Sequence, residues 1–205
     1  MPVSPSKIVC VGRNYSDHAR EMGSEVPKEP LLFLKPPSSI ISNGEAIVLH
    51  PVSTHVEFEG EIALVVGKRL RKAGEDEARA ALSGVVALND VTARDLQRND
   101  GQWARAKGMD TFCPIGEPAA VPDDLSTITL VTTVNGQERQ RARASDMVFA
   151  IPMLLSYISQ YLTLEPGDIV ATGTPAGTRR LEPGDVVEVQ LVGLSSVSNP
   201  VVAGH

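Results

Sequence analysis

The sequence predicts an α+β domain that is mostly β, with short strands joined by turns and only a few helices. Its apolar runs are short, and 17 glycines and 15 prolines interrupt them along the whole chain. A length of 205 residues suits one domain better than two. Because no linker, low-complexity tract or block of charge divides the chain, we expect a single domain over residues 1–205.

The expected strands are short apolar segments that stop at glycine, proline or a polar residue. The clearest local signal is Asn135-Gly136 within the segment 127–142, because this pair favours a two-residue hairpin turn between two strands. The other expected strands lie at 7–12, 31–35, 46–50, 60–68, 84–91, 169–173 and 186–193.

Three segments carry helical signals. Residues 15–23 and 74–84 each predict a short helix that ends at a glycine, the residue that most easily takes the left-handed conformation after a helix. The longest candidate is 145–164, in which Pro152 lies either in the first turn or at a kink. The helices are therefore expected to be few beside the strands.

The pentapeptide LEPGD occurs twice, at 164–168 and at 181–185. Each copy contains a Pro-Gly pair, which suits a tight turn, and each copy is followed by an expected strand. We therefore interpret the echo as one kind of turn used twice rather than as the repeat of a domain.

The bulk composition excludes some classes of partner. A net charge of −6, from 25 acidic and 19 basic residues, argues against nucleic acid or an anionic membrane surface. No apolar run approaches the roughly 18 residues of a membrane-spanning helix, and the first residues lack the features of a signal peptide. Cys10 and Cys113 lack metal-binding or redox spacing and predict reduced, buried thiols in a cytoplasmic protein.

Three glutamates alternate in the segment EFEGEIALVVGK, which spans 57–68. In a strand, Glu57, Glu59 and Glu61 would share one face and repel one another. One interpretation is a solvated strand face. The other is a cation site, because Glu61 adjoins an apolar run and Asp90 ends another expected strand. A set of carboxylates without His or Cys suits a hard cation, Mg²⁺ or Mn²⁺.

A second pattern is YSDHAREM, in which His18 and Glu21 share one face of the expected helix. A carboxylate beside an imidazole raises its basicity, so the pair suits the activation of a water, although an incidental surface contact is the simpler alternative. His50 and His55 lack such a partner in the sequence.

Two further segments carry weaker signals. Segment 103–116 contains Lys107 and Asp110, and a lysine close to an acid usually forms a salt bridge. The small-residue loop 171–178 follows a strand, and its free N–H groups and hydroxyls could hold a carboxylate. The loop lacks the Gly-Lys-Ser/Thr of a nucleotide-binding P-loop.

Seven segments occur in a characteristic order: KIVCVGRNYSDHAREMG, FLKP, VEFEGEIALVVGK, LNDVTARDLQ, AKGMDTFCPIG, VNGQERQ and GDIVATGTPAG. Together they resemble the fumarylacetoacetate hydrolase superfamily over nearly the whole chain. The similarity is greatest to its short members: acylpyruvases, oxaloacetate decarboxylases, fumarylpyruvate hydrolases and the isomerase/decarboxylases of homoprotocatechuate breakdown. The resemblance implies one catalytic domain with a mixed β-sandwich roll and a lid helix, a homodimer, and a site for Mg²⁺ or Mn²⁺.

The resemblance also implies roles for individual residues. The metal ligands of the family match three acidic positions, with Glu57 outside the set: Glu59, Glu61 and Asp90. Six other positions match its catalytic and substrate-contacting residues: His18, Glu21 and Lys107 as catalytic groups, and Arg13, Gln97 and Thr174 as contacts of the substrate.

The implied function is a divalent-metal-dependent C–C hydrolase or decarboxylase that acts on a small 2-oxo acid through an enolate. The expected substrates are an acylpyruvate, fumarylpyruvate or oxaloacetate. One alternative is a 2-hydroxyhepta-2,4-diene-1,7-dioate isomerase/decarboxylase of aromatic catabolism, and another is a non-catalytic binder of metal or oxo acid. The sequence departs from many relatives at Met109, and at Arg179 and Arg180, which either make the distal pocket more positive or face solvent.

Overall fold

The computed structural model describes residues 4–21, 23 and 25–204. Its helices are α1 (Ser16–Glu21), α2 (Glu75–Ala80), α3 (Arg94–Asn99), α4 (Ala104–Lys107) and α5 (Ile151–Tyr161), with 3-10 turns at Pro37–Ser39, Leu125–Thr127 and Ala144–Asp146. Its strands are β1 (Ile8–Gly12), β2 (Leu31–Lys35), β3 (Ile40–Ile41), β4 (Ile47–Leu49), β5 (Val56–Glu57), β6 (Gly60–Val66), β7 (Leu82–Asn89), β8 (Thr92–Ala93), β9 (Cys113–Pro114), β10 (Thr129–Val134), β11 (Gln137–Arg143), β12 (Ile169–Ala171), β13 (Val186–Leu191) and β14 (Ser195–Ala203). Strands outnumber helices, which confirms the α+β, mostly β prediction.

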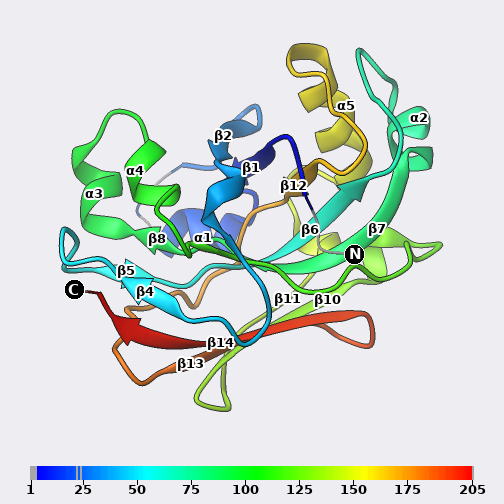
Figure 1. Ribbon diagram of the computed structural model, residues 1–205. Coiled ribbons are helices and arrows are strands. Elements are labelled where there is room, and N and C mark those ends of the chain that lie inside the picture. Colours follow the sequence, from blue (N-terminus) through cyan, green and yellow to red (C-terminus); the bar gives the residue numbers. More distant parts are fainter. Residues whose placement is uncertain (1–3, 22, 24, 205) are drawn as a thin grey trace.

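Two five-stranded sheets form the frame of the molecule (Figure 1). The first has the strand order β2-β1-β12-β6-β7, and the second has the order β11-β10-β13-β14-β4. Each sheet contains one parallel pair, β1 with β12 and β14 with β4, among antiparallel neighbours. Two-stranded ladders, β3-β9 and β5-β8, complete the strand pairing among the described residues. The sheets are therefore mixed, as the expected β-sandwich roll requires.

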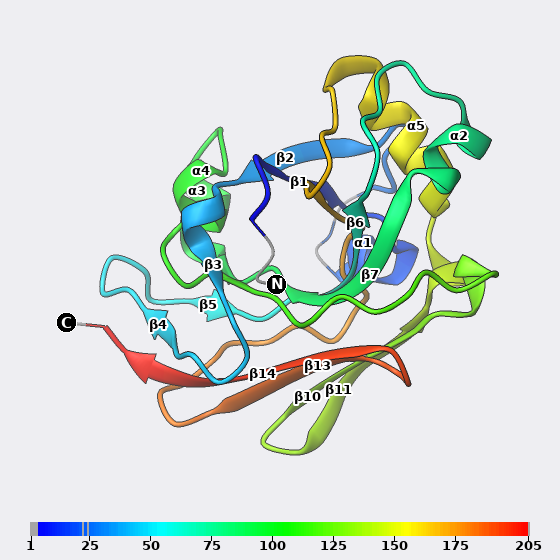
Figure 2. The same ribbon diagram turned by 45° about the vertical axis from the view of Figure 1, so that its right-hand side comes forward.

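The main core lies between the two sheets. In Figure 2 the second sheet forms the lower layer, and α2 and α5 lie together at one end of the first sheet. Val9 and Leu64 of the first sheet belong to the same buried cluster as Leu130 and Val189 of the second sheet and Leu155 of α5. Because alternate side chains of each strand enter this cluster, the other face of the first sheet is free to build a second one.

A second apolar cluster covers that other face of the first sheet. It contains Cys10 of β1, Ala63 of β6 and Leu88 of β7, and the segment around Cys113 packs against them. Both cysteines are free and buried, as the sequence predicts. Burial raises the pKa of the Cys113 thiol to about 12, which keeps the thiol protonated near neutral pH.

The helices depart from the sequence prediction at their ends. The long helix begins at Ile151 rather than at 145, with Pro152 in its first turn, where a missing N–H leaves no helical bond unmade. The helix predicted for 74–84 ends at Ala80, and Gly84 lies in β7 instead. The predicted end of α1 includes Met22, which lies outside the described residues. Within the part of the chain that the structure describes, no helix is both long and apolar enough to span a membrane.

The predicted turns form where the sequence places them. Asn135 and Gly136 have φ values of 53° and 74°, the left-handed pair that a type I′ hairpin needs. Both LEPGD copies close in the same way, because the Asp168 carboxylate accepts the Glu165 N–H at 2.8 Å and the Asp185 carboxylate accepts the Glu182 N–H at 2.9 Å. The repeated pentapeptide is thus a repeated turn.

Candidate active site

The acidic cluster lies at the start of β6 and just past the end of its partner strand β7. In β6, Ile62 and Leu64 enter the core between the sheets, so Glu61 faces the other side with Ala63. The Asp90 N–H donates to the Glu59 carbonyl at 2.8 Å, which extends the β6–β7 ladder by one step past its end. This step brings the side chain of Asp90 beside those of the two glutamates.

Glu59, Glu61 and Asp90 form a candidate metal centre. Each is buried, and each offers an oxygen that lies within 4.8 Å of the others. Three carboxylates without His or Cys are the donor set of a hard divalent cation. The Lys107 ammonium already lies 2.6 Å from both Glu59 Oε2 and Asp90 Oδ2, so part of the cluster is shaped around positive charge. The residues therefore fit Mg²⁺ or Mn²⁺.

The two glutamates of the cluster have pKa values shifted in opposite directions. Burial acts to raise the pKa of Glu59, but the charges on Lys107 and Arg94 outweigh it and hold that pKa well below its usual range. Burial and the charges of Asp90 and Glu59 raise the pKa of Glu61 well above its usual range. The buried cluster can thus hold a proton on Glu61 until a cation takes its place.

Glu57 belongs to an adjoining network of ion pairs rather than to the cluster. Its Oε2 accepts from Arg94 Nη2 at 2.6 Å, and the same nitrogen donates to Glu59 Oε1 at 2.6 Å. His55 Nε2 lies 2.8 Å from Glu57 Oε1, so the expectation that His55 lacks a carboxylate partner is wrong. Thr178 donates to Glu57 at 3.0 Å. Glu57 is buried, which excludes the solvated strand face as well.

Lys107 pairs with the cluster instead of with its sequence neighbour Asp110. Its side chain is 2% exposed, and in the described chain its ion pairs are those with Glu59 and Asp90. Burial favours the neutral amine, but Asp90 and Glu59 together raise the pKa of Lys107 above its ordinary value. The lysine therefore stays charged, 4.9 Å from the centre of the Phe33 ring.

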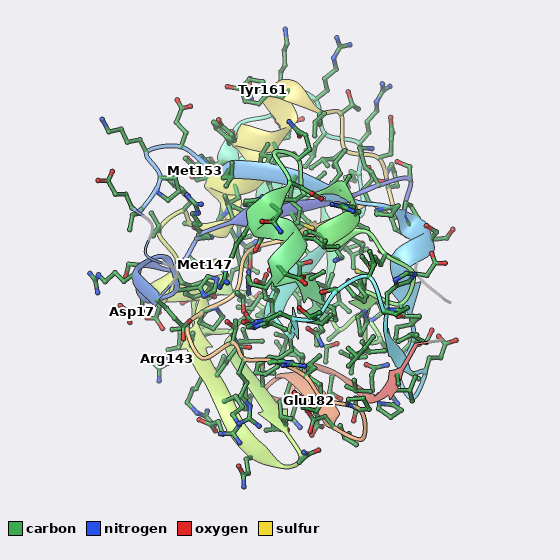
Figure 3. All side chains as sticks on the ribbon, turned by 90° about the vertical axis from the view of Figure 1, so that its left-hand side faces the viewer. Asp17, Arg143, Met147, Met153, Tyr161 and Glu182 are labelled. Atoms are coloured by element: carbon green, nitrogen blue, oxygen red, sulfur yellow. The ribbon has the colours of Figure 1, made fainter. Side chains whose placement is uncertain are left out.

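The pair His18 and Glu21 lies on α1, as the sequence predicts. His18 Nδ1 is 3.3 Å from Glu21 Oε2, and His18 is buried while Glu21 is partly exposed. Asp17, on the outer side of α1, lies at the edge of the molecule in Figure 3. Before the helix, the Asn14 side chain donates to the Thr172 carbonyl at 2.9 Å and accepts the Phe149 N–H at 2.8 Å, which anchors the turn that leads into α1.

The small-residue loop 171–178 holds two carboxylates of the chain itself. Gly173 N–H donates to Glu61 at 2.8 Å, and Gly177 N–H lies 3.2 Å from Glu21 Oε2. Both glycines have positive φ, 100° and 104°, and a Cβ at Gly177 would lie 2.2 Å from a backbone oxygen. Thr174 Oγ1 donates to the Gly60 carbonyl at 2.8 Å. The loop thus connects the acidic cluster with the helix α1.

The side chains of the acidic cluster, Lys107 and the His18–Glu21 pair line one cavity of about 390 Å³. Its lining includes all the residues that the resemblance assigns to the site: Arg13, His18, Glu21, Glu59, Glu61, Asp90, Gln97, Lys107 and Thr174. Arg179 and Arg180 lie outside the lining and are exposed, and Arg180 pairs with Glu182 at 3.1 Å. The two loop arginines therefore face solvent.

Comparison with known proteins shows the family of the chain. The family described as "Fumarylacetoacetate (FAA) hydrolase C-terminal" matches residues 7–202 of the chain. The chain belongs to this family. A mitochondrial oxaloacetate tautomerase of Arabidopsis thaliana is 43% identical over 199 residues, which are 94% of this chain and 89% of the relative. The oxaloacetate tautomerase YisK of Bacillus subtilis is 38% identical over 211 residues, with 96% and 70% covered.

Solved structures of the fumarylacetoacetate hydrolase family show the same fold. A 5-carboxymethyl-2-hydroxymuconate delta-isomerase from Mycobacterium smegmatis superposes with a TM-score of 0.91 at 44% identity, over 100% of this chain and 81% of that one. A 2-hydroxyhepta-2,4-diene-1,7-dioate isomerase from Mycobacterium marinum gives 0.90 at 41% identity, over 98% and 76%. The expected roll is therefore confirmed.

The sequence prediction missed two cations of this candidate site. Lys35 is fully buried at the end of β2, where its ammonium donates to Asp90 Oδ1 at 2.7 Å and also bonds the carbonyl of Lys107. Arg94 begins α3 and bridges Glu57 and Glu59. For Lys35 the available signal was a lysine at the end of an apolar run, because such a charge is buried only with partners. Arg94 lies in a polar segment, which gave no such signal.

Proposed function

We propose that this chain is a divalent-metal-dependent enzyme that forms the enolate of a small 2-oxo acid. The observation that carries the proposal is the buried set of Glu59, Glu61 and Asp90 beside His18 and Lys107 in one cavity. A non-catalytic binder would need the carboxylates but not a buried histidine held by an acid. Membership of the family and the names of its relatives support the same conclusion.

Glu59, Glu61 and Asp90 would hold Mg²⁺ or Mn²⁺. When bound, the cation supplies a Lewis acid that polarises the oxygens of a 2-oxo acid. Lys107 Nζ lies between two of these carboxylates and brings a fixed positive charge to the same end of the cavity. We infer that Lys107 stabilises the negative charge that develops on the substrate as the enolate forms.

His18 is the proposed acid and base. Because its Nδ1 faces Glu21, the Nε2 atom is the nitrogen left to take up and return a proton. Glu21 keeps the ring in this orientation, and the Gly177 N–H fixes Glu21 in turn. His18 is only 5% exposed, which keeps it away from bulk water.

The reaction that these groups support best is a proton transfer, a keto–enol tautomerisation or double-bond shift. Two relatives are named oxaloacetate tautomerases and two structural neighbours are named isomerases. The second candidate is C–C cleavage, by hydrolysis of an acylpyruvate or fumarylpyruvate or by decarboxylation of oxaloacetate. The pair of buried His18 and partly exposed Glu21 favours it, because the pair can also deprotonate a water.

A substrate panel tests both candidates. The purified protein with Mg²⁺ is offered enol-oxaloacetate, acetylpyruvate, fumarylpyruvate and 2-hydroxyhepta-2,4-diene-1,7-dioate, with chelator as the control. We expect turnover that is lost with chelator and lost in His18→Ala, while His18→Ala keeps its affinity for Mg²⁺. Absence of turnover on every substrate while the metal is bound would contradict the proposal and favour a binder. Sedimentation of the same sample tests the expected homodimer.

A further inference from the structure

The segment VNGQERQ, at 134–140, ends in a glutamine that the proposed function does not use. Gln140 lies in β11 of the second sheet and is 1% exposed. Its side chain bonds Gly60 at the start of β6, and it also bonds Thr174 and Pro175 in the loop 171–178. A side chain of the second sheet therefore connects two parts of the candidate site.

These partners fix the orientation of the Gln140 amide. The Gly60 N–H can only donate, so the atom that it meets at 3.1 Å is the amide oxygen, Oε1. The Pro175 carbonyl can only accept, so the atom that it meets at 2.8 Å is Nε2. The other hydrogen of Nε2 is donated to Thr174 Oγ1 at 2.8 Å. Both hydrogens of the amide are thus used.

The orientation of Gln140 determines that of the Thr174 hydroxyl. A hydroxyl has one hydrogen and two lone pairs, and one lone pair of Thr174 accepts from Gln140. The hydrogen is donated to the Gly60 carbonyl at 2.8 Å, just as the Thr172 N–H is donated to the Ile62 carbonyl at 3.1 Å. Within the part of the chain that the structure describes, no donor uses the second lone pair of Thr174.

Close packing encloses the amide of Gln140. A Cβ at Gly60 would lie 1.9 Å from Thr132 Oγ1 and 3.1 Å from Gln140 Oε1, and Thr132 is the partner of Gln140 in the β10–β11 ladder. In the loop 171–178, a Cβ at Gly177 would lie 3.4 Å from Gln140 Cγ. The amide therefore lies in a narrow space between the start of β6 and this loop.

The Thr174 hydroxyl lies beside the expected metal ligands. Thr174 is 3% exposed and lines the cavity. Its partner Gly60 lies between Glu59 and Glu61 in the chain. Gly173, which precedes Thr174, donates its N–H to Glu61 at 2.8 Å. A ligand held at the acidic cluster therefore meets a hydroxyl whose hydrogen is already donated to Gly60, and which offers the ligand a lone pair.

We propose that Gln140 is a positioning residue that holds the Thr174 hydroxyl as a hydrogen-bond acceptor, so that Thr174 binds the hydroxyl of an enol or 2-hydroxy acid in preference to a keto oxygen. A ligand oxygen without a hydrogen would have to draw the hydroxyl hydrogen away from the Gly60 carbonyl, which would leave that buried carbonyl without its donor. This inference rests on the proposed function, because it assumes that the C2 oxygen of the ligand is held at the acidic cluster.

The sharpest test uses two ligands that differ only at C2. Pyruvate has a keto oxygen there, and lactate has a hydroxyl. Calorimetry measures the affinity of the Mg²⁺-loaded protein for pyruvate and for both enantiomers of lactate. We expect Thr174→Val, which removes the acceptor, to lower the affinity for lactate about fivefold more than the affinity for pyruvate. Thr174→Ser keeps the hydroxyl and should keep the wild-type ratio of the two affinities.

A double-mutant cycle tests whether Gln140 acts through Thr174. Gln140→Met removes the amide, so the hydroxyl is free to turn and donate to a keto oxygen, and the preference for lactate should fall. In the variant that combines Gln140→Met with Thr174→Val, the ratio should equal that of Thr174→Val alone. Gln140→Glu is a second variant of similar shape that lacks the two amide hydrogens, and it should change the ratio in the same direction as Gln140→Met.

Asn199→Leu is the matched control. Asn199 is also a buried amide, 1% exposed, and it donates to the carbonyls of Ser42 and Glu45 at 2.8 Å each, outside the lining of the cavity. We expect Asn199→Leu to lower the denaturation midpoint, as Gln140→Met does, because both variants leave buried carbonyls without donors. Only the variants of Gln140 should change the ratio of the two affinities.

The outcomes separate this inference from the proposed function. If the Mg²⁺-loaded wild type binds both ligands and Thr174→Val lowers both affinities by the same factor, the inference is wrong while the proposed function stands. Additive changes of the ratio in the double variant would show that Gln140 does not act through the hydroxyl, which also overturns the inference. If the Mg²⁺-loaded wild type binds neither ligand, the proposed function fails and the inference fails with it.

Discussion

Lys107 Nζ donates to Asp90 Oδ2 at 2.6 Å, with both side chains almost completely buried. The same ammonium bonds Glu59, so a protein cation joins two of the three expected metal ligands. Removing one partner of a buried ion pair leaves the other charge without compensation and costs about 3–5 kcal/mol. We expect Lys107→Met to destabilise the metal-free protein by this amount, and Mg²⁺ to restore more stability in the variant than in the wild type.

Chemical denaturation with chelator and with Mg²⁺ measures both effects. The matched control is Arg105→Met, which removes an exposed cation paired with Asp100 and should change neither measurement noticeably. Equal stability of Lys107→Met and wild type in chelator would show that the buried carboxylates do not depend on this lysine.

A pH prediction follows from Glu61. Burial and the charges of Asp90 and Glu59 raise the pKa of Glu61, so the metal-free folded protein keeps a proton that the unfolded chain releases. The metal-free protein therefore loses stability as pH rises above the ordinary pKa of a glutamate, and this loss is complete above the raised pKa. Because a cation needs the carboxylate, its affinity should rise over the same range.

Calorimetric titration of Mg²⁺ in two buffers with different ionisation enthalpies measures the released proton. We expect the wild type to release a proton on binding the cation wherever the raised pKa keeps Glu61 protonated. Glu61→Gln should release none and should bind Mg²⁺ more weakly. Identical apparent enthalpies in the two buffers with the wild type would contradict a proton held on Glu61.

Glu57 and Glu59 have different partners, so their substitution should have different effects on Mg²⁺ binding and on stability. Glu57 contacts Arg94, His55 and Thr178, whereas Glu59 lies in the acidic cluster. We expect Glu59→Gln to weaken Mg²⁺ binding more than Glu57→Gln does. Glu57→Gln should instead lower stability by about 1–3 kcal/mol, because Arg94 loses a charged acceptor in a buried position. Equal losses of Mg²⁺ affinity in the two variants would mean that Glu57 also reaches the cation.

The sequence predicted the parts of the site that local patterns encode. Alternation placed Glu61 on the face opposite Ile62, and the end of an apolar strand pointed to Asp90. Helical spacing placed His18 and Glu21 together. Local patterns did not predict which carboxylate each buried lysine or arginine pairs with. Lys35 and Asp90 are 55 residues apart, and Lys35 ends β2 while Asp90 follows β7, the two opposite edge strands of the first sheet, so no local pattern shows that they meet.

In the fold, too, features that depend on neighbouring residues were predicted, and features that depend on distant contacts were not. The hairpin at Asn135-Gly136 and the turns of LEPGD depend on neighbouring residues, and they form as predicted. The start of α5 does not depend on propensity alone. Residues Ala144–Asp146 form a 3-10 turn, and the next residue, Met147, bridges to Tyr15 near the other end of the chain. Tertiary pairing therefore outweighs the helical signal of this segment.

The two copies of LEPGD provide a matched pair of carboxylates for a last prediction. In both copies the aspartate closes its own turn, but the Asp168 carboxylate also accepts from Ser6 N–H at 2.9 Å and from the Lys7 ammonium. Asp168 thus fastens the chain before β1 to the turn before β12. Asp185 has one further partner, the Asn135 side chain at 2.7 Å. We expect Asp168→Asn to cost about 1–3 kcal/mol of stability, because it leaves the donors around a buried side chain poorly matched, and Asp185→Asn to cost less.

The pH dependence distinguishes the two variants further. Burial acts to raise the pKa of Asp168, but hydrogen bonds from Glu165, Lys7 and Ser6 outweigh it and lower the pKa below its ordinary value. A carboxyl with a lowered pKa stabilises the folded protein above its unfolded pKa, and this contribution is lost as pH falls through the folded value. Denaturation midpoints of the wild type should therefore fall steeply below about pH 4, with a shallower fall in Asp168→Asn. An unchanged slope in that variant would mean that other acids control acid unfolding.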